Sequence, residues 1–266
     1  MASSGLLPGV SFRCVGEEGH DPLPTAGNLL LVTDHLDASA DFLLIRAATT
    51  VLKPNKAHSP TAIKKCIFMT FAREEAHWRA ILGKANVIGT KDADLTFLDL
   101  FSQWRSSKPA NDGDDSLFGN GHLDEAYKML KAELANATRS SIVLIDDLAH
   151  LEWVGINEQD IVRFLRSIRS LLREAGASLL IIYHKLAIET PTSDVQRYLL
   201  STCLAHIECR PLVSGRSGSV AGEIRFHIGP EAWPGDMSTP TRQVLHYRCT
   251  DITGVVFEKG STSILT

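Results

Sequence analysis

The sequence predicts an α/β fold in which helices cover a mostly parallel central sheet that ends in an antiparallel C-terminal extension. Two observations carry this prediction. Short unbroken apolar runs, typical of strands buried on both faces, alternate with helical stretches through residues 28–202. Shorter strand-like runs separated by turns then follow from Leu204 onward, as expected for antiparallel strands.

The composition fits one domain with a substantial core. Of the 266 residues, 44% are hydrophobic. The net charge of −4 gives no overall attraction to phosphates, so we expect any nucleic-acid contact to come from a local patch. Five scattered cysteines indicate reduced thiols, and the first residues lack the pattern of a secretory leader. We therefore expect a cytoplasmic protein, also found in the nucleus, without a membrane span, metal or cofactor.

The first half of the chain predicts an arm followed by alternating strands and helices. Residues 1–27 are rich in Pro, Gly and Ser and predict an extended N-terminal arm, before a single domain over residues 28–266. Apolar runs predict strands, and apolar residues at helical spacing predict helices. The expected strands are 28–33, 64–71, 95–100 and 142–145, and the expected helices are 42–53, 74–86 and 123–134. The Pro, Gly, Asn and Asp content of residues 102–121 predicts a long exposed loop.

The second half adds one long helix and the strands of the extension. Asn157 is placed to cap a helix over residues 158–175, and Gly176 is placed to end it. The apolar run of residues 178–183 predicts another central strand, followed by a loop and a short helix within residues 186–202. Antiparallel strands are expected at residues 204–208, 223–228, 244–247 and 254–258.

The turn after the first strand stands where many nucleotide-binding α/β proteins hold phosphate. A working loop reads G-x-x-x-x-G-K-[ST], because glycines let backbone N–H groups wrap the phosphates while the Lys and the hydroxyl complete the site. Here Asp34 and Ser39 replace the two glycines, Ala40 replaces the lysine, and Asp41 replaces the hydroxyl residue. The loop is degenerate, and its acids fit better as caps at the positive end of the helix.

Two further strand ends carry acids. Asp146 and Asp147 follow the buried run of residues 142–145, as the Mg²⁺-binding acids of a Walker B strand do, although acids also simply end strands. Arg73 and Glu75 follow the second strand. We interpret Glu75 as an acid that starts a helix, and the alternative is a nucleotide hydrolase that uses it with Asp146 and Asp147.

Basic and titratable side chains complete the candidates. His184, at the end of the strand over residues 178–183, lies near the acids, and we interpret it as a hydrogen-bonded structural histidine. The long helix carries four arginines that are either a solvated face or a contact surface for an acidic partner subunit: Arg163, Arg166, Arg169 and Arg173. The candidates for nucleic-acid contact are Lys185, Arg197 and Arg216.

Several segments together resemble a known family. The turn D-x-x-x-x-S at residues 34–39, the segment SIVLIDDLAHL, the strand LLIIYHK and the tail YRCTDITGVVFEKG are similar to the accessory Elongator subunits of RecA-like fold. The resemblance spans roughly residues 25–266. It implies a RecA-like three-layer fold whose degenerate P-loop and Walker B-like acids indicate ancestry more than activity.

The resemblance also implies partners and a function. In that family three related subunits form a hetero-hexameric ring with two copies of each, so it implies two related RecA-like subunits (Elongator complex proteins 4 and 5), the catalytic Elongator subcomplex and tRNA as partners. The ring supports modification of the tRNA wobble uridine (U34). We therefore expect a non-catalytic pseudo-ATPase, with Arg73 as the candidate residue for completing a neighbouring subunit's site. A RecA-paralogue adaptor in DNA repair is the remaining alternative.

Overall fold

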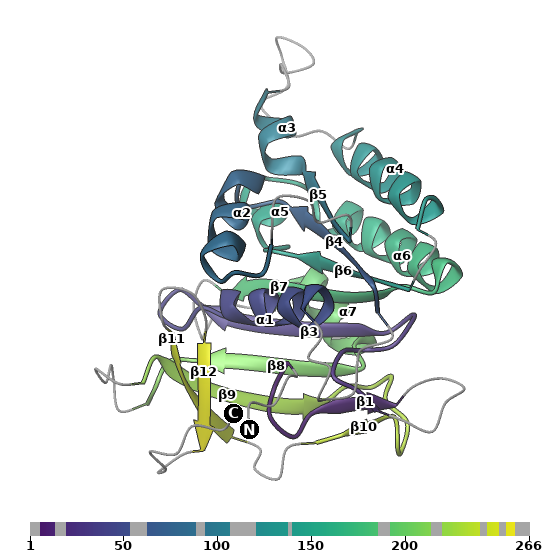
Figure 1. Cartoon of the computed structure of the whole chain (residues 1–266). Coiled ribbons are helices and arrows are strands. Elements are labelled where there is room, and N and C mark those ends of the chain that lie inside the picture. Colours follow the sequence, from purple (N-terminus) through teal and green to yellow (C-terminus); the bar gives the residue numbers. More distant parts are fainter. Residues whose placement is uncertain are drawn as a thin grey trace.

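The computed structural model describes residues 6–13, 20–53, 63–88, 94–106, 121–137, 140–185, 192–213, 220–239, 244–249 and 254–258. A sheet of nine strands runs through the molecule in the order β12-β11-β9-β8-β3-β7-β6-β4-β5 (Figure 1). Its parallel strands are β3 (Leu29–His35), β4 (Lys65–Thr70), β5 (Leu95–Asp99), β6 (Ser141–Ile145), β7 (Ser178–Lys185) and β8 (Ala205–Arg210). The antiparallel extension adds β9 (Gly222–Ile228), β11 (Val244–Cys249) and β12 (Gly254–Glu258).

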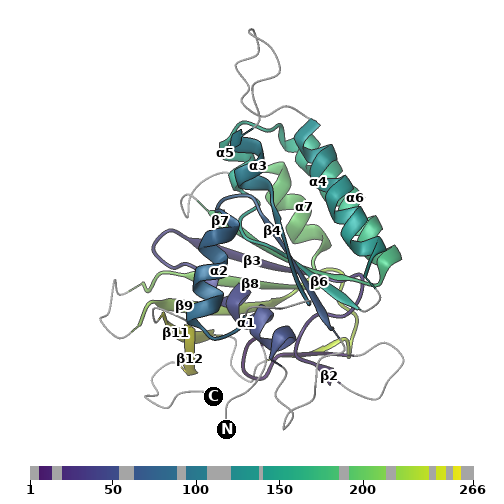
Figure 2. The ribbon, with the colours of Figure 1, turned by 45° about the horizontal axis from the view of Figure 1, so that its top comes forward.

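Helices cover the parallel part of this sheet on both faces, which explains its near-continuous apolar strands. One face packs against α1 (Asp41–Leu52) and α2 (Glu75–Lys84). The other packs against α3 (Leu100–Ser106), α4 (Gly121–Ala135), α5 (His150–Trp153), α6 (Glu158–Ala175) and α7 (Asp194–Thr202). Figure 2 shows α4 and α6 side by side on the outer surface of this layer. The predicted fold class, a mostly parallel sheet between helical layers with an antiparallel extension, is confirmed.

The long helix begins and ends where its flanking residues indicate. The side chain of Asn157 accepts a hydrogen bond from the backbone N–H of Gln159 at 2.8 Å, which satisfies one of the N–H groups that a helix start leaves open. Gly176 ends the helix in the left-handed conformation, at φ 65°, which glycine adopts without steric cost. Both predicted boundaries of α6 are therefore confirmed.

The N-terminal segment differs from the extended arm expected over residues 1–27. Its described part forms β1 (Ser11–Arg13) and β2 (His20–Asp21), which join β10 (Met237–Ser238) in a second, three-stranded sheet. Leu6, Leu7 and Phe12 are buried in the core on the α1 side of the large sheet. The apolar residues of this segment therefore pack against the chain's own domain. Burying their side chains stabilises the folded protein, whereas an extended arm would leave them exposed to water.

Two other elements were not anticipated. The predicted loop over residues 102–121 overlaps α3, where Leu100 and Trp104 are buried one helical turn apart, and its centre lies outside the described residues. The apolar segment after Asp147 forms the short helix α5. Across the described part of the chain, no helix is both long and apolar enough to cross a bilayer.

Candidate functional site: the carboxyl edge of the central strands

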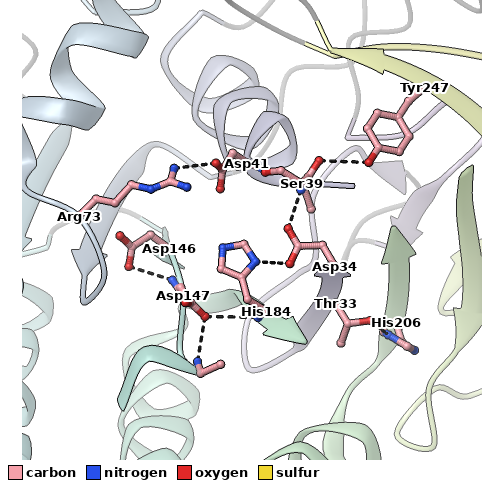
Figure 3. A network of polar contacts seen from close by, with 12 residues as sticks. Thr33, Asp34, Ser39, Asp41, Arg73, Asp146, Asp147, His184, His206 and Tyr247 are labelled. Carbon is pink, nitrogen blue, oxygen red and sulfur yellow. Dashed lines mark hydrogen bonds and ion pairs between the residues drawn. The ribbon is translucent and has the colours of Figure 1, made fainter. Parts of the chain in front are cut away.

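The acids singled out in the sequence meet at one edge of the sheet. In the register of β3 and β7, Asp34 lies beside His184. Asp146 and Asp147 directly follow β6, the other neighbour of β7, so they reach the same edge. Figure 3 shows these side chains around one small volume between the end of β7 and the start of α1. This is the edge at which open α/β sheets bind ligands.

Asp146 is fully engaged as a structural acceptor. Its Oδ1 accepts hydrogen bonds from the backbone N–H groups of Phe71 at 2.8 Å and Asp147 at 2.9 Å, and its Oδ2 accepts one from Nε1 of Trp78 at 3.2 Å. Burial raises its pKa to about 6, even though these hydrogen bonds oppose the shift. Asp146 therefore ties the end of β6 to the turn after β4 and to the first turns of α2.

Asp147 orders the loop that leads into α5. Its Oδ1 accepts hydrogen bonds from the backbone N–H groups of Ala149 at 2.9 Å and His184 at 3.3 Å. Its Oδ2 is buried and has no hydrogen-bond partner among the described residues. Burial raises the pKa of this carboxyl to about 7. The second Walker B-like acid thus differs from the first, because among the described residues only one of its two oxygens accepts hydrogen bonds.

Asp34 and His184 form a buried ion pair. Asp34 is completely buried, its Oδ1 contacts Nδ1 of His184, and its Oδ2 accepts the backbone N–H of Ala40 at 2.7 Å. Burial opposes protonation of the imidazole, but the hydrogen bond and charge of Asp34 outweigh it and raise the pKa of His184 to about 9. Burial raises the pKa of Asp34, and the contact with His184 opposes that rise. His184 is therefore cationic at neutral pH and serves as the counter-ion of Asp34.

A second pair lies at the start of α1. Arg73, in the turn after β4, donates to Oδ2 of Asp41 at 2.6 Å, and its guanidinium lies 5.6 Å from the ring centre of Trp78. Burial lowers the pKa of this guanidinium, but the charge and hydrogen bond of Asp41, together with the charges of Asp146 and Asp147, outweigh burial and raise it. Arg73 therefore acts within its own chain in this structure. Its predicted role in a neighbouring subunit's site stays a prediction.

The C-terminal extension closes over the same turn. The hydroxyl of Tyr247 on β11 donates to the carbonyl of Ser39 at 3.3 Å, and its ring stacks on Phe42 of α1 with centroids 4.8 Å apart. Within the turn, the N–H of Asp41 donates to Oγ of Ser39 at 3.3 Å. The N–H groups of Ala40 and Asp41, which in a phosphate loop would point at a ligand, donate inside the chain instead.

The acids of this turn are not conventional caps of α1. Asp41 is the first residue of the helix and pairs with Arg73, while the N-cap residue Ala40 has no side chain able to accept a hydrogen bond. Asp34 bridges to the N–H of Ala40 from the end of the preceding strand. The predicted stabilisation of the helix start by acids thus arises through an ion pair and a bridging carboxylate rather than through local capping.

The remaining candidates are dispersed. Glu75 pairs with Arg79 along α2, and its backbone N–H donates to Asp99 at 3.0 Å, as expected for an acid at a helix start. Lys185 lies 3.4 Å from Glu208, and Arg197 pairs with Asp194. Arg216 lies outside the described residues.

The four arginines of α6 do not form one free surface. Arg169 is buried, with an exposed fraction of 7%, and donates to Glu231 at 2.6 Å, and Arg173 contacts the same carboxylate at 3.3 Å. Arg163 pairs with Asp160 at 2.7 Å, and Arg166 lies over the ring of Tyr198. Arg169 therefore cannot serve as an exposed contact, whereas the side chain of Arg173 is 56% exposed, and the predicted interface remains a prediction for Arg163, Arg166 and Arg173.

Sequence reasoning found most of the site residues but missed their pairings, and it missed Tyr247. The partnership of Asp34 with His184 depends on the register of β3 against β7, and that of Asp41 with Arg73 depends on the path of the turn after β4. Tyr247 carries no local signal, since it comes from a strand more than 200 residues away. Among the described residues, no group of three or more His, Cys, Asp or Glu side chains is arranged to hold a metal ion.

Comparison with known proteins defines the fold. No protein-family model matches the chain, and no curated protein matches it by sequence. A KaiC-like protein from the hyperthermophilic archaeon Pyrococcus horikoshii OT3 superposes with a TM-score of 0.53 at 12% identity, over 87% of this chain and 90% of that one. The chain has a RecA-like fold. At this identity the likeness concerns the fold alone.

Proposed function

We propose that this RecA-like chain is a non-catalytic subunit of the hetero-hexameric Elongator accessory ring and corresponds to Elongator complex protein 6. The proposal combines the fold with the resemblance of the turn at residues 34–39, the segment SIVLIDDLAHL and the tail FEKGSTSIL. Its partners are then Elongator complex proteins 4 and 5, two copies of each, the catalytic Elongator subcomplex and tRNA. Its work is to assemble the ring and to support modification of the wobble uridine.

One observation supports the pseudo-ATPase part above all others. At the turn between β3 and α1, His184 and Arg73 are engaged by Asp34 and Asp41 of the same chain. A triphosphate placed there would have to displace these carboxylates or lie beside them. Each of these cations is already neutralised by a carboxylate, so the turn has no surplus of positive charge to attract a polyanion. A working phosphate loop, by contrast, presents a lysine and free backbone N–H groups to the phosphates.

Two of the three acids that the hydrolase alternative requires already make contacts within the chain. Asp146 accepts hydrogen bonds through both of its oxygens, and Glu75 pairs with Arg79. Asp147 keeps one buried oxygen without a described partner, so it is the acid through which that alternative has to be tested.

Calorimetric titration of the full chain with Mg-ATP tests the proposal. We expect no binding at millimolar nucleotide in the wild-type chain. Micromolar binding that disappears in Asp147→Ala but persists in Asp124→Ala, an exposed acid on α4, would instead establish a nucleotide site.

Co-purification tests the assembly. We expect the tagged endogenous chain to bring down the two related Elongator subunits and to prefer tRNA over single-stranded DNA. Recovery of recombination proteins together with a preference for single-stranded DNA would favour the DNA-repair adaptor instead.

A further inference from the structure

One face of the antiparallel extension is polar and lies beyond the helical layers. On β8, β9 and β11, alternate side chains such as Ile207, Phe226 and Leu245 enter the core on the α1 side. The intervening side chains point to the opposite face. Among the described residues, the main contacts of the helices with the sheet fall on β3, β4, β5 and β7, so this part of the sheet is not covered by a described helix (Figure 1).

We call this surface the open sheet face. It continues the side of the sheet that carries Thr33 and Lys185 at the ends of β3 and β7. Its members on β8, β9 and β11 are His206, Glu208 and Arg210 of β8, Glu223, Arg225 and His227 of β9, and Val244, His246 and Arg248 of β11. Val255 and Phe257 of β12 adjoin them on the same side of the sheet.

The open sheet face carries a positive balance on a chain that is negative overall. Lys185 and the three arginines Arg210, Arg225 and Arg248 face two carboxylates, Glu208 and Glu223, so the fixed charges leave a surplus of two positive charges by this count, whereas the whole chain carries −4.

The carboxylates lie beneath the cations and hold them in place. Glu208 has a side-chain exposed fraction of 15% and contacts Lys185 at 3.4 Å and Arg210 at 3.9 Å. Glu223 is exposed by 6% and binds Arg225, itself exposed by 36%, at 2.6 Å. Cations that are already ordered lose less conformational entropy when they bind a ligand, so this arrangement favours binding more than flexible surface lysines would.

The histidines of the face stiffen it. Nε2 of His206 lies 2.7 Å from the hydroxyl of Thr33, a contact that Figure 3 shows, and its ring stacks on His227 of the neighbouring strand with centroids 5.3 Å apart. Burial lowers the pKa of His206 to about 4, so this imidazole is neutral at physiological pH. The strands that present the arginines are thus linked by side chains as well as by the backbone ladder.

A cavity of about 470 Å³ lies at the edge of this surface, where β9 and β11 meet. It is lined by residues of both sides of the sheet: Arg225, His227 and Val244 from the open sheet face, Phe226 and Ile228 from the opposite side, and Thr239. Its volume lies within the range of pockets that accept small ligands or single groups of larger ones. An arginine, a histidine and a threonine hydroxyl can all donate hydrogen bonds to phosphate oxygens there.

These properties favour a nucleic-acid backbone over an acidic protein. Strong protein–protein contacts depend on buried aromatic or aliphatic anchors. The apolar side chains on this side of the extension, Val244 of β11 and Val255 and Phe257 of β12, are all partly buried, and Phe257 packs edge-on against His246. A phosphate backbone needs ordered Arg and Lys side chains and no apolar anchor.

We propose that the open sheet face binds the phosphate backbone of a structured RNA. From β7 to β11 the face spans four inter-strand spacings, or about 19 Å, enough for contact with several phosphates. The inference rests on the proposed function and locates its RNA contact away from the carboxyl edge. Of the candidates from the sequence, it retains Lys185 and replaces Arg197 and Arg216 with Arg210, Arg225 and Arg248.

The test measures RNA affinity as a function of salt concentration. A fluorescently labelled tRNA transcript is titrated with the full chain and, separately, with the assembly that co-purifies with it. The titrations cover 50 to 200 mM KCl, a range in which phosphate contacts dominate the response to salt. The variant combines Arg210→Gln, Arg225→Gln and Arg248→Gln. The control combines Arg13→Gln, Arg79→Gln and Arg105→Gln, which remove equal charge from exposed positions elsewhere.

We expect the variant to bind at least about tenfold more weakly at 50 mM KCl and to lose roughly two to three units of the logarithmic salt slope, about one for each phosphate contact removed. The control should retain the wild-type slope. Because Arg225 covers a buried carboxylate, the single change Arg248→Gln on the exposed side of β11 provides a milder variant, with an expected loss of about one unit.

The possible failures are distinct. Wild-type binding that is equal in the variant and the control would overturn the open sheet face as the RNA site while leaving the proposed function intact. Absence of RNA binding by both the chain and its assembly would overturn the proposed function as well. Poly-glutamate, titrated in the same way, serves as the probe for an acidic protein. If the variant loses poly-glutamate binding but keeps its RNA affinity, the face binds an acidic protein and the inference is overturned.

Discussion

The ion pair between Asp34 and His184 makes the sharpest prediction for stability. Replacing His184 with Gln removes the positive charge that neutralises a completely buried carboxylate, while keeping a side chain that can form hydrogen bonds. The rise in pKa from 6.5 to about 9 corresponds to about 3 kcal/mol of stability at neutral pH. Breaking a buried ion pair by removing one partner costs a similar amount, roughly 3–5 kcal/mol.

The sign of the pH dependence follows from the same shift. Because the pKa of His184 is higher in the folded than in the unfolded protein, its contribution is fully present below pH 6.5 and is lost as the pH rises through about 9. The wild-type chain should therefore lose about 3 kcal/mol between pH 6.5 and pH 9.5 in excess of His184→Gln. At neutral pH we expect the variant to melt roughly 6–12 °C lower.

Urea unfolding followed by circular dichroism, at half-unit pH steps across that range, measures the free energy of unfolding at pH 7 and its dependence on pH. A thermal scan at pH 7 measures the melting temperature. The exposed residue His20 of β2 provides the control His20→Gln, which should follow the wild-type curve throughout. Equal pH dependence in the wild type and His184→Gln would refute the assignment of His184 as the cationic partner of Asp34, and unchanged stability at pH 7 would refute its energetic importance.

Two further predictions concern residues that make single hydrogen bonds. Trp78→Phe keeps an aromatic ring in the core but removes the donor to Asp146 and part of the buried indole, so the free energy of unfolding should fall by at least about 1–3 kcal/mol, whereas Trp233→Phe at an exposed site should change little in the same urea titration. Asn157→Ala should cost about 1 kcal/mol by removing the cap of α6, and Asn157→Ser, which can still accept the N–H of Gln159, should recover most of it; equal midpoints for the two variants would contradict the capping role.

Local patterns predicted the parallel part of the fold because its strands are buried on both faces and therefore read as unbroken apolar runs. Residues 142–145 and 178–183 are such runs, and both lie in the middle of the sheet. The ends of α6 were also predictable, because a cap and a left-handed glycine act within one turn of the helix. The packing of the N-terminal segment could not be predicted in this way. Phe12 pairs with Met237, which is far away in the sequence, so local patterns do not reveal this partner.

The candidate site shows the same division. That Asp34, Asp146 and Asp147 share one edge follows from strand ends alone. Which acid is neutralised, and by what, depends on the strand register that brings His184 beside Asp34. Nothing near Arg169 in the sequence indicates that it will be buried and paired with Glu231. One of the four arginines that suggested a basic helix surface is therefore part of an internal ion pair.

The pairing of β1 with β10 bears on how the protein is made. Synthesis runs from the N-terminus, so Leu6, Leu7 and Phe12 emerge from the ribosome more than 200 residues before Met237, which closes over their strand. Until β10 has been synthesised, this apolar segment lacks the strand that pairs with it, and exposed apolar segments promote aggregation. A nascent chain that stops before β10 should therefore need a chaperone, whereas the finished chain supplies its own cover.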